Sequence, residues 1–449
     1  MTLLKTLETI DSFIWGLPLI TLLVGTGLFL TIRLNFVQFL HWRHALDLIR
    51  GKYDNKNDEG DISHFQALSA ALSATIGLGN IAGVALAITM GGPGAVFWMW
   101  VTALVGMATK YTSCTLAVKY RLTHKNGSIS GGPMYFIEKG LGPRFKFLSV
   151  FFSFACIFAA FGMGNMFQAN QVAKALFDGF HIPHYMTGII LAVLAYLVII
   201  GGIKRIGQVA SRLVPFMCLL YIVAAILILI IKIDVLVNSF LLIMTSAFTG
   251  TAAIGGFAGV AVSKTIVKGV ARGIFSNEAG LGSSPIAHAA AKTKEPVREG
   301  LVAMAEPFID TIIICSMTAL VIVSTGVWTE AEGIAGIALT IKAFESVLPH
   351  FGGYIVIFSA TLFAFSTMIS WSYYGERSAE YILGEKAVYA FKMAYVFLIV
   401  VGAVYELTPI ILFCDIANAC MAIPTLFALV ALSGIVKKLT QDYFERTFS

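Results

Sequence analysis

The stretch Ser73-Ala74-Thr75-Ile76-Gly77-Leu78-Gly79-Asn80 puts two glycines, two hydroxyl side chains and an asparagine in the middle of an otherwise apolar run from about His64 to Met90. A run of this length can cross a bilayer as a helix, which takes roughly 20 apolar residues. Backbone groups in hydrocarbon need hydrogen-bond partners, so unwound backbone at membrane depth persists only inside protein or beside a cavity. The stretch therefore predicts either a binding site or, if Gly77 and Gly79 act only as small residues, a close helix contact.

The composition of the whole chain is that of a helical membrane protein. Of its 449 residues 58% are hydrophobic and only 12% are charged, and the mean hydropathy is +0.84. Soluble proteins carry about 25% charged residues, and the strands of membrane barrels are much shorter than these apolar runs. The six cysteines show no CxxC or metal-ligand spacing, so neither a disulfide framework nor a zinc site is predicted. We expect the lipid bilayer as a partner, with no nucleic acid and no obligate protein partner.

Apolar segments predict about 11 transmembrane helices in a single domain over residues 1–449. The expected spans are residues 13–32, 62–90, 95–118, 147–177, 186–201, 206–231, 263–291, 301–323, 353–382, 388–404 and 410–436. Residues 234–262 are predicted to form a surface or re-entrant segment, and residues 326–351 an extramembrane loop with a short helix. The N-terminus lacks a basic start and a small-residue cleavage site, so we expect the first span to be retained.

Lysine and arginine are unevenly distributed over the loops between these spans. With the N-terminus outside, most of the basic residues fall in the loops that face the cytoplasm. The positive-inside rule then predicts a cytoplasmic C-terminus, in agreement with an odd number of spans. The chain is therefore predicted to be a multi-pass protein of the cell (inner or plasma) membrane.

The seventh span carries a second interruption, Gly273-Ile274-Phe275-Ser276-Asn277-Glu278-Ala279-Gly280-Leu281-Gly282. It lies five spans after the first interruption and therefore crosses the membrane in the opposite direction. Interrupted segments at matching positions of two halves are typical of transporters built from inverted repeats. We predict repeats over residues 62–232 and 263–436, with residues 13–32 as an additional first helix.

The directions of the two broken helices indicate the kind of ligand they would bind. The outer half of the second span begins near Gly79, so its free N–H groups would face an anion. The outer half of the seventh span ends near Phe275 and Ser276, so its free carbonyl groups would face a cation. An amino acid, which carries both charges, fits between the two breaks.

Three motifs along the chain are long enough to be specific. The first is Gly77-Leu78-Gly79-Asn80 followed by residues 91–100 (GGPGAVFWMW), the second runs from Gly269 to Gly273 and on to residues 287–293 (AHAAAKT), and the third is residues 371–376 (WSYYGE). Together they resemble the alanine or glycine:cation symporter (sodium:alanine symporter) family, and the resemblance covers essentially the whole chain. It implies the all-α, five-plus-five inverted fold of the leucine transporter. It also implies sodium-coupled symport of alanine or glycine into the cell by alternating access.

The resemblance further implies a substrate site at the two breaks and on two other spans. The matching residues are Thr75, Gly79 and Asn80 on the carboxylate side, Phe275, Ser276 and Asn277 on the seventh span, Gln168 on the fourth span and Trp371 on the ninth. Gln168 can instead serve as an interhelical hydrogen-bonding residue, and Trp371 as a packing residue. Walls made by Phe275 and Trp371 would favour substrates with small side chains.

A coupling ion would lie between the first broken helix and the ninth span, by the same resemblance. Its ligands would be the carbonyl groups of Ser73, Ile76 and Ala364 and the hydroxyl groups of Thr367 and Ser366. Hard cations prefer such oxygen ligands, and a neutral set of oxygens suits Na⁺. Alternatively, these hydroxyl groups bond the carbonyl groups of the preceding helical turn.

Four acidic residues within the predicted spans, Glu278, Glu306, Asp310 and Asp415, keep proton coupling open, because a proton needs a titratable group at the site. They can also pair or gate, and Arg272 is then a candidate partner. Beyond Na⁺ no cofactor is expected.

Two other classes of protein fit the sequence less well. The eight histidines fall in loops or near span ends, and neither GxSxG nor HExxH occurs, so an enzyme is not expected. No repeated filter sequence points to a channel. The main alternative is a proton-coupled carrier of another small amino acid.

Overall fold

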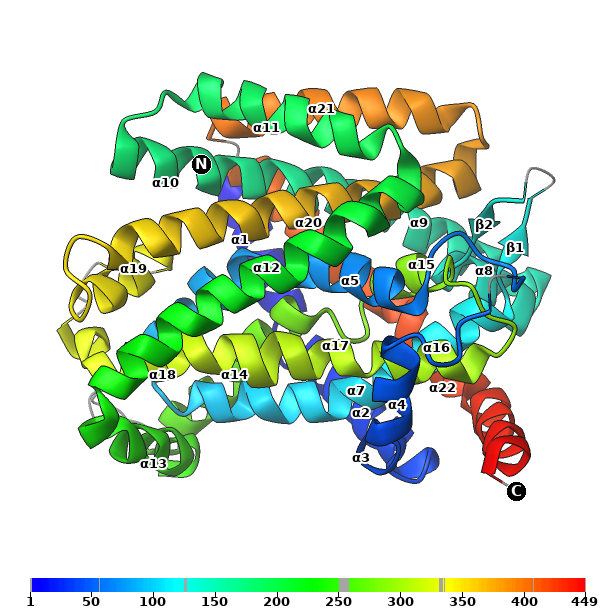
Figure 1. The fold of residues 1–449 in the computed structure, drawn as a ribbon, viewed down its shortest axis with the longest axis horizontal. Coiled ribbons are helices and arrows are strands. Elements are labelled where there is room, and N and C mark those ends of the chain that lie inside the picture. The colour runs from blue at the N-terminus through cyan, green and yellow to red at the C-terminus, as the bar shows by residue number, and fades with distance from the viewer. Residues whose placement is uncertain are drawn as a thin grey trace.

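The computed structural model describes residues 2–55, 57–124, 127–249, 258–330, 334, 336–406 and 408–448. Helices make up almost all of these residues and form one bundle (Figure 1). The first half contains α1 (Thr2–Ile14), α2 (Leu17–Arg33), α3 (Val37–Leu40), α4 (Trp42–Ile49), α5 (His64–Thr75), η1 (Gly79–Gly83), α6 (Val84–Gly91), α7 (Ala95–Lys119), β1 (Leu122–Thr123), β2 (Ile129–Ser130), α8 (Pro133–Phe136), η2 (Ile137–Leu141), η3 (Pro143–Phe145), α9 (Lys146–Phe161), η4 (Gly162–Met166), α10 (Phe167–Phe180), α11 (His184–Ile199) and α12 (Gly202–Ile231). The second half contains α13 (Ile233–Thr249), α14 (Ala258–Asn277), α15 (Ser284–His288), α16 (Pro296–Ala303), α17 (Ala305–Pro307), η5 (Phe308–Cys315), α18 (Ser316–Thr325), η6 (Val327–Glu330), α19 (Ile337–Glu345), α20 (Gly352–Leu383), α21 (Ala387–Val404) and α22 (Thr408–Phe448).

Long apolar helices dominate the described residues. Seven of them are long and apolar enough to cross a membrane, and the bent pair of α5 with η1–α6 would make an eighth. Two further helices, α11 and α13, are also apolar but shorter. Their outward side chains are apolar too: Val193, Leu197, Leu219 and Ile230 are each more than half exposed. Apolar surface of this extent fits contact with lipid and not with water.

The segment over residues 234–262, predicted to be a surface or re-entrant piece, is helical in its described part. Helix α13 covers its first part, residues 250–257 lie outside the described residues, and α14 begins at Ala258. The hydroxyl and glycine residues that follow Met244 lowered the apolar content of the segment, so the helix was missed. The short helix predicted within residues 326–351 is present as α19.

The first interruption is a bend between two helices. Ser63 begins α5 with a capping box, in which its hydroxyl accepts from the backbone N–H of Gln66 and the Gln66 side chain accepts from the backbone N–H of Ser63. The helix ends at Thr75, because Ile76 is extended. A new helical segment starts at Gly79, and the two halves meet at an angle of 54°.

The second interruption lies later than predicted. Helix α14 continues through Phe275 and Ser276 to Asn277, and the chain then unwinds until α15. Glu278, Gly280 and Gly282 have left-handed backbone conformations, with φ of 53°, 96° and 94°. A Cβ atom on Gly280 would lie 2.5 Å from Leu23 Cδ2, so only glycine fits this turn.

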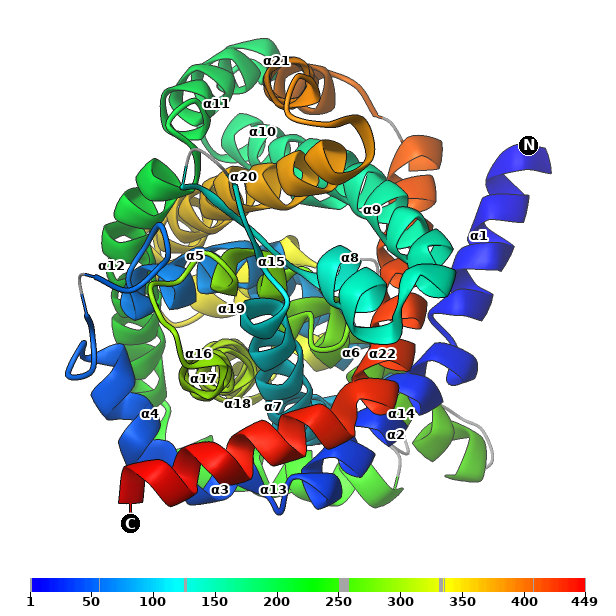
Figure 2. The ribbon, with the colours of Figure 1, turned by 90° about the vertical axis from the view of Figure 1, so that its right-hand side faces the viewer.

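The long helices are arranged around the two interrupted ones. Helix α20 crosses the bundle above α5, α12 runs diagonally past α5 from α11 to α13, and α7 and α14 lie side by side below α5 (Figure 1). Helices α11 and α21 pack together at one edge (Figure 1), and α22 runs past α2 and α9 on another face (Figure 2). The two breaks therefore meet in the interior of the bundle.

Candidate functional site

A cavity of about 30 Å³ lies where the two interrupted helices meet, and we call it the central cavity. It is lined by Ala74, Thr75, Gly77, Leu78, Gly79, Met163, Gln168, Phe275, Glu278, Thr367, Trp371 and Asn418. Five of the predicted substrate residues, Thr75, Gly79, Gln168, Phe275 and Trp371, are thus brought together from four separate parts of the chain. Of the predicted ion ligands, Thr367 lies in the same wall.

The first break forms one wall of this cavity. The N–H group of Gly77 donates to Asn80 Oδ1 at 2.9 Å, which fixes the unwound turn. A Cβ atom on Gly77 would lie 2.7 Å from Thr367 Oγ1, so glycine allows the break to approach α20 closely. Because a new helical segment begins at Gly79, its first N–H groups have no partner within that helix.

Three predicted substrate residues lie behind the cavity walls instead of lining them. Asn80 Nδ2 donates to Asp310 Oδ1 at 2.6 Å, and Ser276 Oγ donates to Asp310 Oδ2 at 2.8 Å. Asn277 Nδ2 donates to Thr311 Oγ1 at 3.2 Å. These bonds tie both breaks to the wide helical segment η5, so the three side chains shape the cavity from outside it.

Glu278 is the acidic residue among the lining residues that the site prediction left out. Trp371 Nε1 donates to Glu278 Oε1 at 3.1 Å, and Ser283 Oγ donates to Oε2. In the described part of the chain its carboxylate forms no ion pair. Lys110, a cation whose field acts on Glu278, is paired with Glu306 at 2.8 Å. The position of Glu278 inside the second break was visible in the sequence and was the signal for this role.

Arg272, the candidate partner predicted for the four acidic residues of the spans, lies at the same cavity as Asp415 and not at the cavity lined by Glu278. Its guanidinium lies over the ring of Phe275 at 5.7 Å and lines a second cavity of about 270 Å³, which we call the Arg272 cavity. Asp11 and Asp415 also line the Arg272 cavity. Phe275 belongs to the walls of both cavities and therefore separates them. Its ring also meets the edge of Trp15, with the ring centres 6.3 Å apart.

The predicted ion ligands lie between α5 and α20. Ser73 Oγ donates to the carbonyl of Ser366 at 2.7 Å, and Ser366 Oγ lies 3.1 Å from the carbonyl oxygen of Ser73. The hydroxyl groups of Ser366 and Thr367 both donate to the carbonyl of Phe363, at 2.8 and 3.0 Å, and these are the helical-turn bonds expected as the alternative. Ile76 and Ala364 are fully buried beside them.

The four acidic residues of the spans fall into different environments. Glu278 lines the central cavity and Asp415 lines the Arg272 cavity. Asp310 is held by Asn80 and Ser276, as described above. Glu306, although only four positions before Asp310, belongs to a separate buried ion cluster with Lys110.

Comparison with known proteins places these features in context. The family model described as "Sodium:alanine symporter family" matches residues 1–448 of this chain. An uncharacterized transporter of Haemophilus influenzae is 49% identical over 447 residues, which cover 99% of this chain and 97% of that protein. The sodium/alanine symporter AgcS of Methanococcus maripaludis is 46% identical over 449 residues, covering 99% and 98%. A crystal structure of MhsT in complex with L-phenylalanine superposes with a TM-score of 0.59 at 14% identity, covering 83% of this chain and 89% of that one, which shows a shared fold.

Proposed function

We propose that this chain, which belongs to the sodium:alanine symporter family, couples the entry of Na⁺ to the uptake of small neutral amino acids such as alanine and glycine. Members of this family are secondary transporters and not enzymes. Uptake proceeds by alternating access, with Na⁺ as the coupling ion and no other cofactor. The two repeats span residues 62–232 and 263–436, with the N-terminus outside and the C-terminus in the cytoplasm.

The observation that carries this proposal is that the start of a helix and a carboxylate both line the central cavity. The first turn of the segment that begins at Gly79 offers N–H groups and the positive end of a helix dipole. The carboxylate of Glu278 lines the same cavity from the second break. An amino acid would place its carboxylate at the first and its ammonium group at the second.

The size of the central cavity supports a small substrate and a closed conformation. In liquid water one molecule takes up about 30 Å³, and the central cavity has about the same volume. The walls must therefore move before an amino acid can enter. Phe275 is the side chain to which we assign that movement, because it lines both the central cavity and the Arg272 cavity. In the proposed orientation the Arg272 cavity opens to the outside.

The sodium ion is proposed to bind between α5 and α20. Its ligands are the carbonyl oxygens of Ser73, Ile76 and Ala364 and the hydroxyl oxygens of Ser366 and Thr367. The 3.1 Å approach of Ser366 Oγ to the carbonyl of Ser73 supports this assignment. Ion and substrate would then share Thr367, which lines the central cavity, and this shared wall couples their binding.

The test is binding of glycine and L-alanine to the purified protein in NaCl and in matched choline chloride. We expect binding in NaCl and its loss in choline chloride. Binding of neither amino acid under either condition would contradict the proposed substrate class.

The second candidate function is a proton-coupled carrier of another small amino acid, and the carboxylate of Glu278 in the cavity wall is the observation that favours it. Such a carrier would bind its substrate in choline chloride as well, with an affinity that follows pH. The same binding experiment, repeated over a pH series, therefore separates the two functions.

A further inference from the structure

Two buried side-chain oxygens in the walls of the central cavity have no hydrogen-bond partner. They are Gln168 Oε1 and Asn418 Oδ1, on residues that are only 6% and 4% exposed. Among the described residues that line this cavity, no other side-chain oxygen or nitrogen is buried without a partner. A buried acceptor without a partner is costly, so a ligand that brings a hydrogen-bond donor would stabilise each of these oxygens.

The orientation of the Gln168 amide follows from its other contact. Its Nε2 donates to the carbonyl of Met163 at 3.1 Å, in the wide helical turn η4. This bond leaves Oε1 as the free end of the amide. A Cβ atom on Gly77 would lie 3.9 Å from Oε1, so the oxygen lies beside the first break.

Asn418 is a lining residue that the site prediction did not include, and it comes from α22. Helix α22 contacts the surroundings of the cavity on both sides of Asn418. A Cβ atom on Gly162 of η4 would overlap Cys414, one turn before Asn418. Thr425 Oγ1, two turns after it, donates to the carbonyl of Leu281 in the second break at 3.3 Å. The two contacts hold the amide of Asn418 at the cavity wall.

The carboxylate of Glu278 is the third acceptor at this cavity. It accepts hydrogen bonds from Trp371 and Ser283, and a carboxylate offers about four lone-pair sites, so it can accept from a further donor. The three acceptors come from three separate parts of the chain. A primary ammonium group has three N–H donors, one for each of them.

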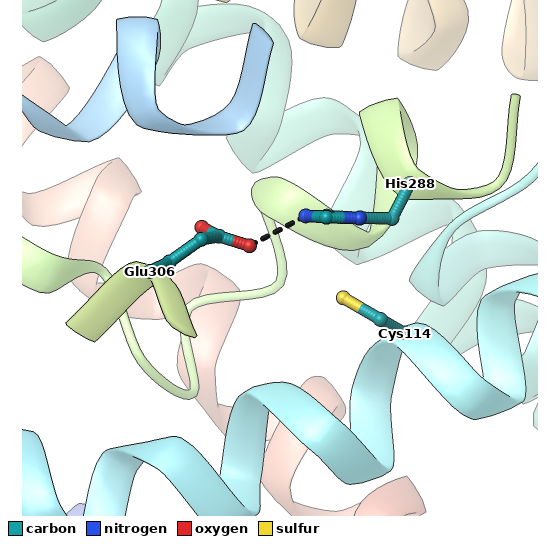
Figure 3. A group of neighbouring side chains, drawn as sticks. All are labelled: Cys114, His288 and Glu306. Atoms are coloured by element: carbon teal, nitrogen blue, oxygen red, sulfur yellow. Dashed lines mark hydrogen bonds and ion pairs between the residues drawn. The ribbon is translucent and has the colours of Figure 1, made fainter. Parts of the chain in front are cut away.

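A buried group elsewhere in the bundle shows an acidic side chain whose donors come from the protein itself. Cys114, His288 and Glu306 lie close together (Figure 3). His288 Nε2 lies 2.6 Å from Glu306 Oε1, and Lys110 Nζ lies 2.8 Å from Glu306 Oε2. Both oxygens of this carboxylate therefore have a partner. The two amide oxygens at the central cavity have none, which favours a ligand at the cavity and not at this group.

We propose that Asn418 is a specificity-determining residue, whose side-chain carbonyl binds the ammonium group of the amino acid together with Gln168 and Glu278. The site then selects amino acids with an unsubstituted amino group, because a methyl group on the nitrogen leaves one of the three acceptors without a donor. The inference rests on the proposed function and adds to it a requirement on the substrate nitrogen.

The first test compares L-alanine with N-methylglycine, which are isomers. The methyl group is on the α-carbon in the first and on the nitrogen in the second, so the two differ in N–H donors and not in size. Titration into the purified wild type in NaCl should give a Kd for N-methylglycine roughly 10- to 100-fold above that for L-alanine, as expected for one hydrogen bond to a charged group. Equal Kd values would overturn the inference.

The second test uses Asn418→Ala, which removes one acceptor and leaves room for an N-methyl group. The Kd for L-alanine should rise while that for N-methylglycine stays nearly the same, so their ratio should fall by roughly tenfold or more. Asn165→Ala is the matched control, since Asn165 is also buried with an unpartnered Oδ1 but does not line the central cavity. Its ratio should remain that of the wild type.

A purely structural role of Asn418 would weaken the binding of both isomers alike, and an unchanged ratio in Asn418→Ala would therefore contradict the inference. The wild-type comparison needs no variant, so the inference can fail even where Asn418→Ala does not fold. Failure of the proposed function would look different. The wild type would then bind no L-alanine at all, which overturns both, whereas failure of this inference alone appears only in the ratio of the two Kd values.

Discussion

At the scale of single residues, Glu278 is the side chain whose surroundings bear most directly on amino-acid binding. Its carboxylate is buried, accepts hydrogen bonds from Trp371 and Ser283, and forms no ion pair in the described structure. A buried carboxylate is stabilised by a cation, and the ammonium group of a bound amino acid would supply one.

Glu278→Gln should therefore weaken amino-acid binding while keeping the shape of the cavity. A hydrogen bond to a charged group contributes about 1.5–3 kcal/mol, which corresponds to roughly a 10- to 100-fold rise in Kd. Titration of L-alanine into the purified variant in NaCl measures the change. Glu385→Gln, on the exposed end of the same protein, is the matched control and should bind as the wild type does. An unchanged Kd in Glu278→Gln would remove Glu278 from the site.

Thr367→Val should raise the sodium concentration that gives half-maximal uptake. The substitution keeps the volume of the side chain but removes one neutral oxygen ligand, at a cost of about 1 kcal/mol or roughly fivefold in sodium affinity. Thr361→Val is the control, because Thr361 makes the same kind of bond to the preceding turn of α20, at 2.8 Å to Ile357. Equal sodium dependence in both variants would place the ion elsewhere.

At the scale of elements, the second interruption depends on its glycines. Gly280→Ala puts a methyl group 2.5 Å from Leu23 Cδ2 and also strains the left-handed backbone. Gly384→Ala is the matched control, because Gly384 is left-handed too, with φ of 82°, but has nothing within 4 Å. Backbone strain of this kind costs about 1–3 kcal/mol, so both variants should be less stable.

The steric conflict should make Gly280→Ala the less stable of the two, and it alone should lose alanine binding. Thermal unfolding of both proteins in detergent, followed by titration with alanine, tests this. Equal unfolding temperatures would show that Leu23 moves aside without cost.

The positions of the breaks show what a sequence can and cannot predict. Gly273 was read as the start of the second interruption, yet it lies within α14, where a Cβ would meet Thr102 Oγ1 at 2.2 Å. It is a glycine of close packing, whereas Gly280 and Gly282 are glycines of left-handed backbone. The sequence shows a glycine in both cases, and only the packing against the neighbouring helix distinguishes close packing from left-handed backbone.

The same limit applies to the site. Thr75, Gln168 and Trp371 were expected to meet, and they line one cavity. Asn80 was expected there as well but is held by Asp310, a partner 230 positions away that no local pattern indicates. His64 and His288, predicted in loops or near span ends, are likewise buried, and both contact Glu299 on another helix. Long apolar runs and helix breaks can be read from a sequence, whereas the partner of each polar side chain follows from packing.

At the scale of the whole molecule, the leucine-transporter-type fold implied by the family resemblance is confirmed by the similarity to MhsT. The family, predicted from three motifs, is confirmed over almost the full chain. The repeats and the orientation in the membrane stay predictions, since they rest on symmetry and on loop charge.

Orientation can be tested with two single cysteines at exposed positions near the chain ends. A membrane-impermeant maleimide added to intact cells should label Glu8→Cys and should leave Glu445→Cys unlabelled until the cells are opened. Native cysteines give little background, because five of the six are buried and the sixth is only partly exposed. Labelling of Glu445→Cys in intact cells would reverse the proposed topology.

The oxygen ligands proposed for the sodium ion between α5 and α20 are all neutral, and this has an electrical consequence. A group with no net charge does no work against the membrane potential when it moves, whereas one elementary charge moved across 100 mV corresponds to about 2.3 kcal/mol. A zwitterionic amino acid is also neutral. The current that accompanies uptake should therefore come from Na⁺ alone, and membrane voltage should drive accumulation only through the sodium ions that each substrate brings with it.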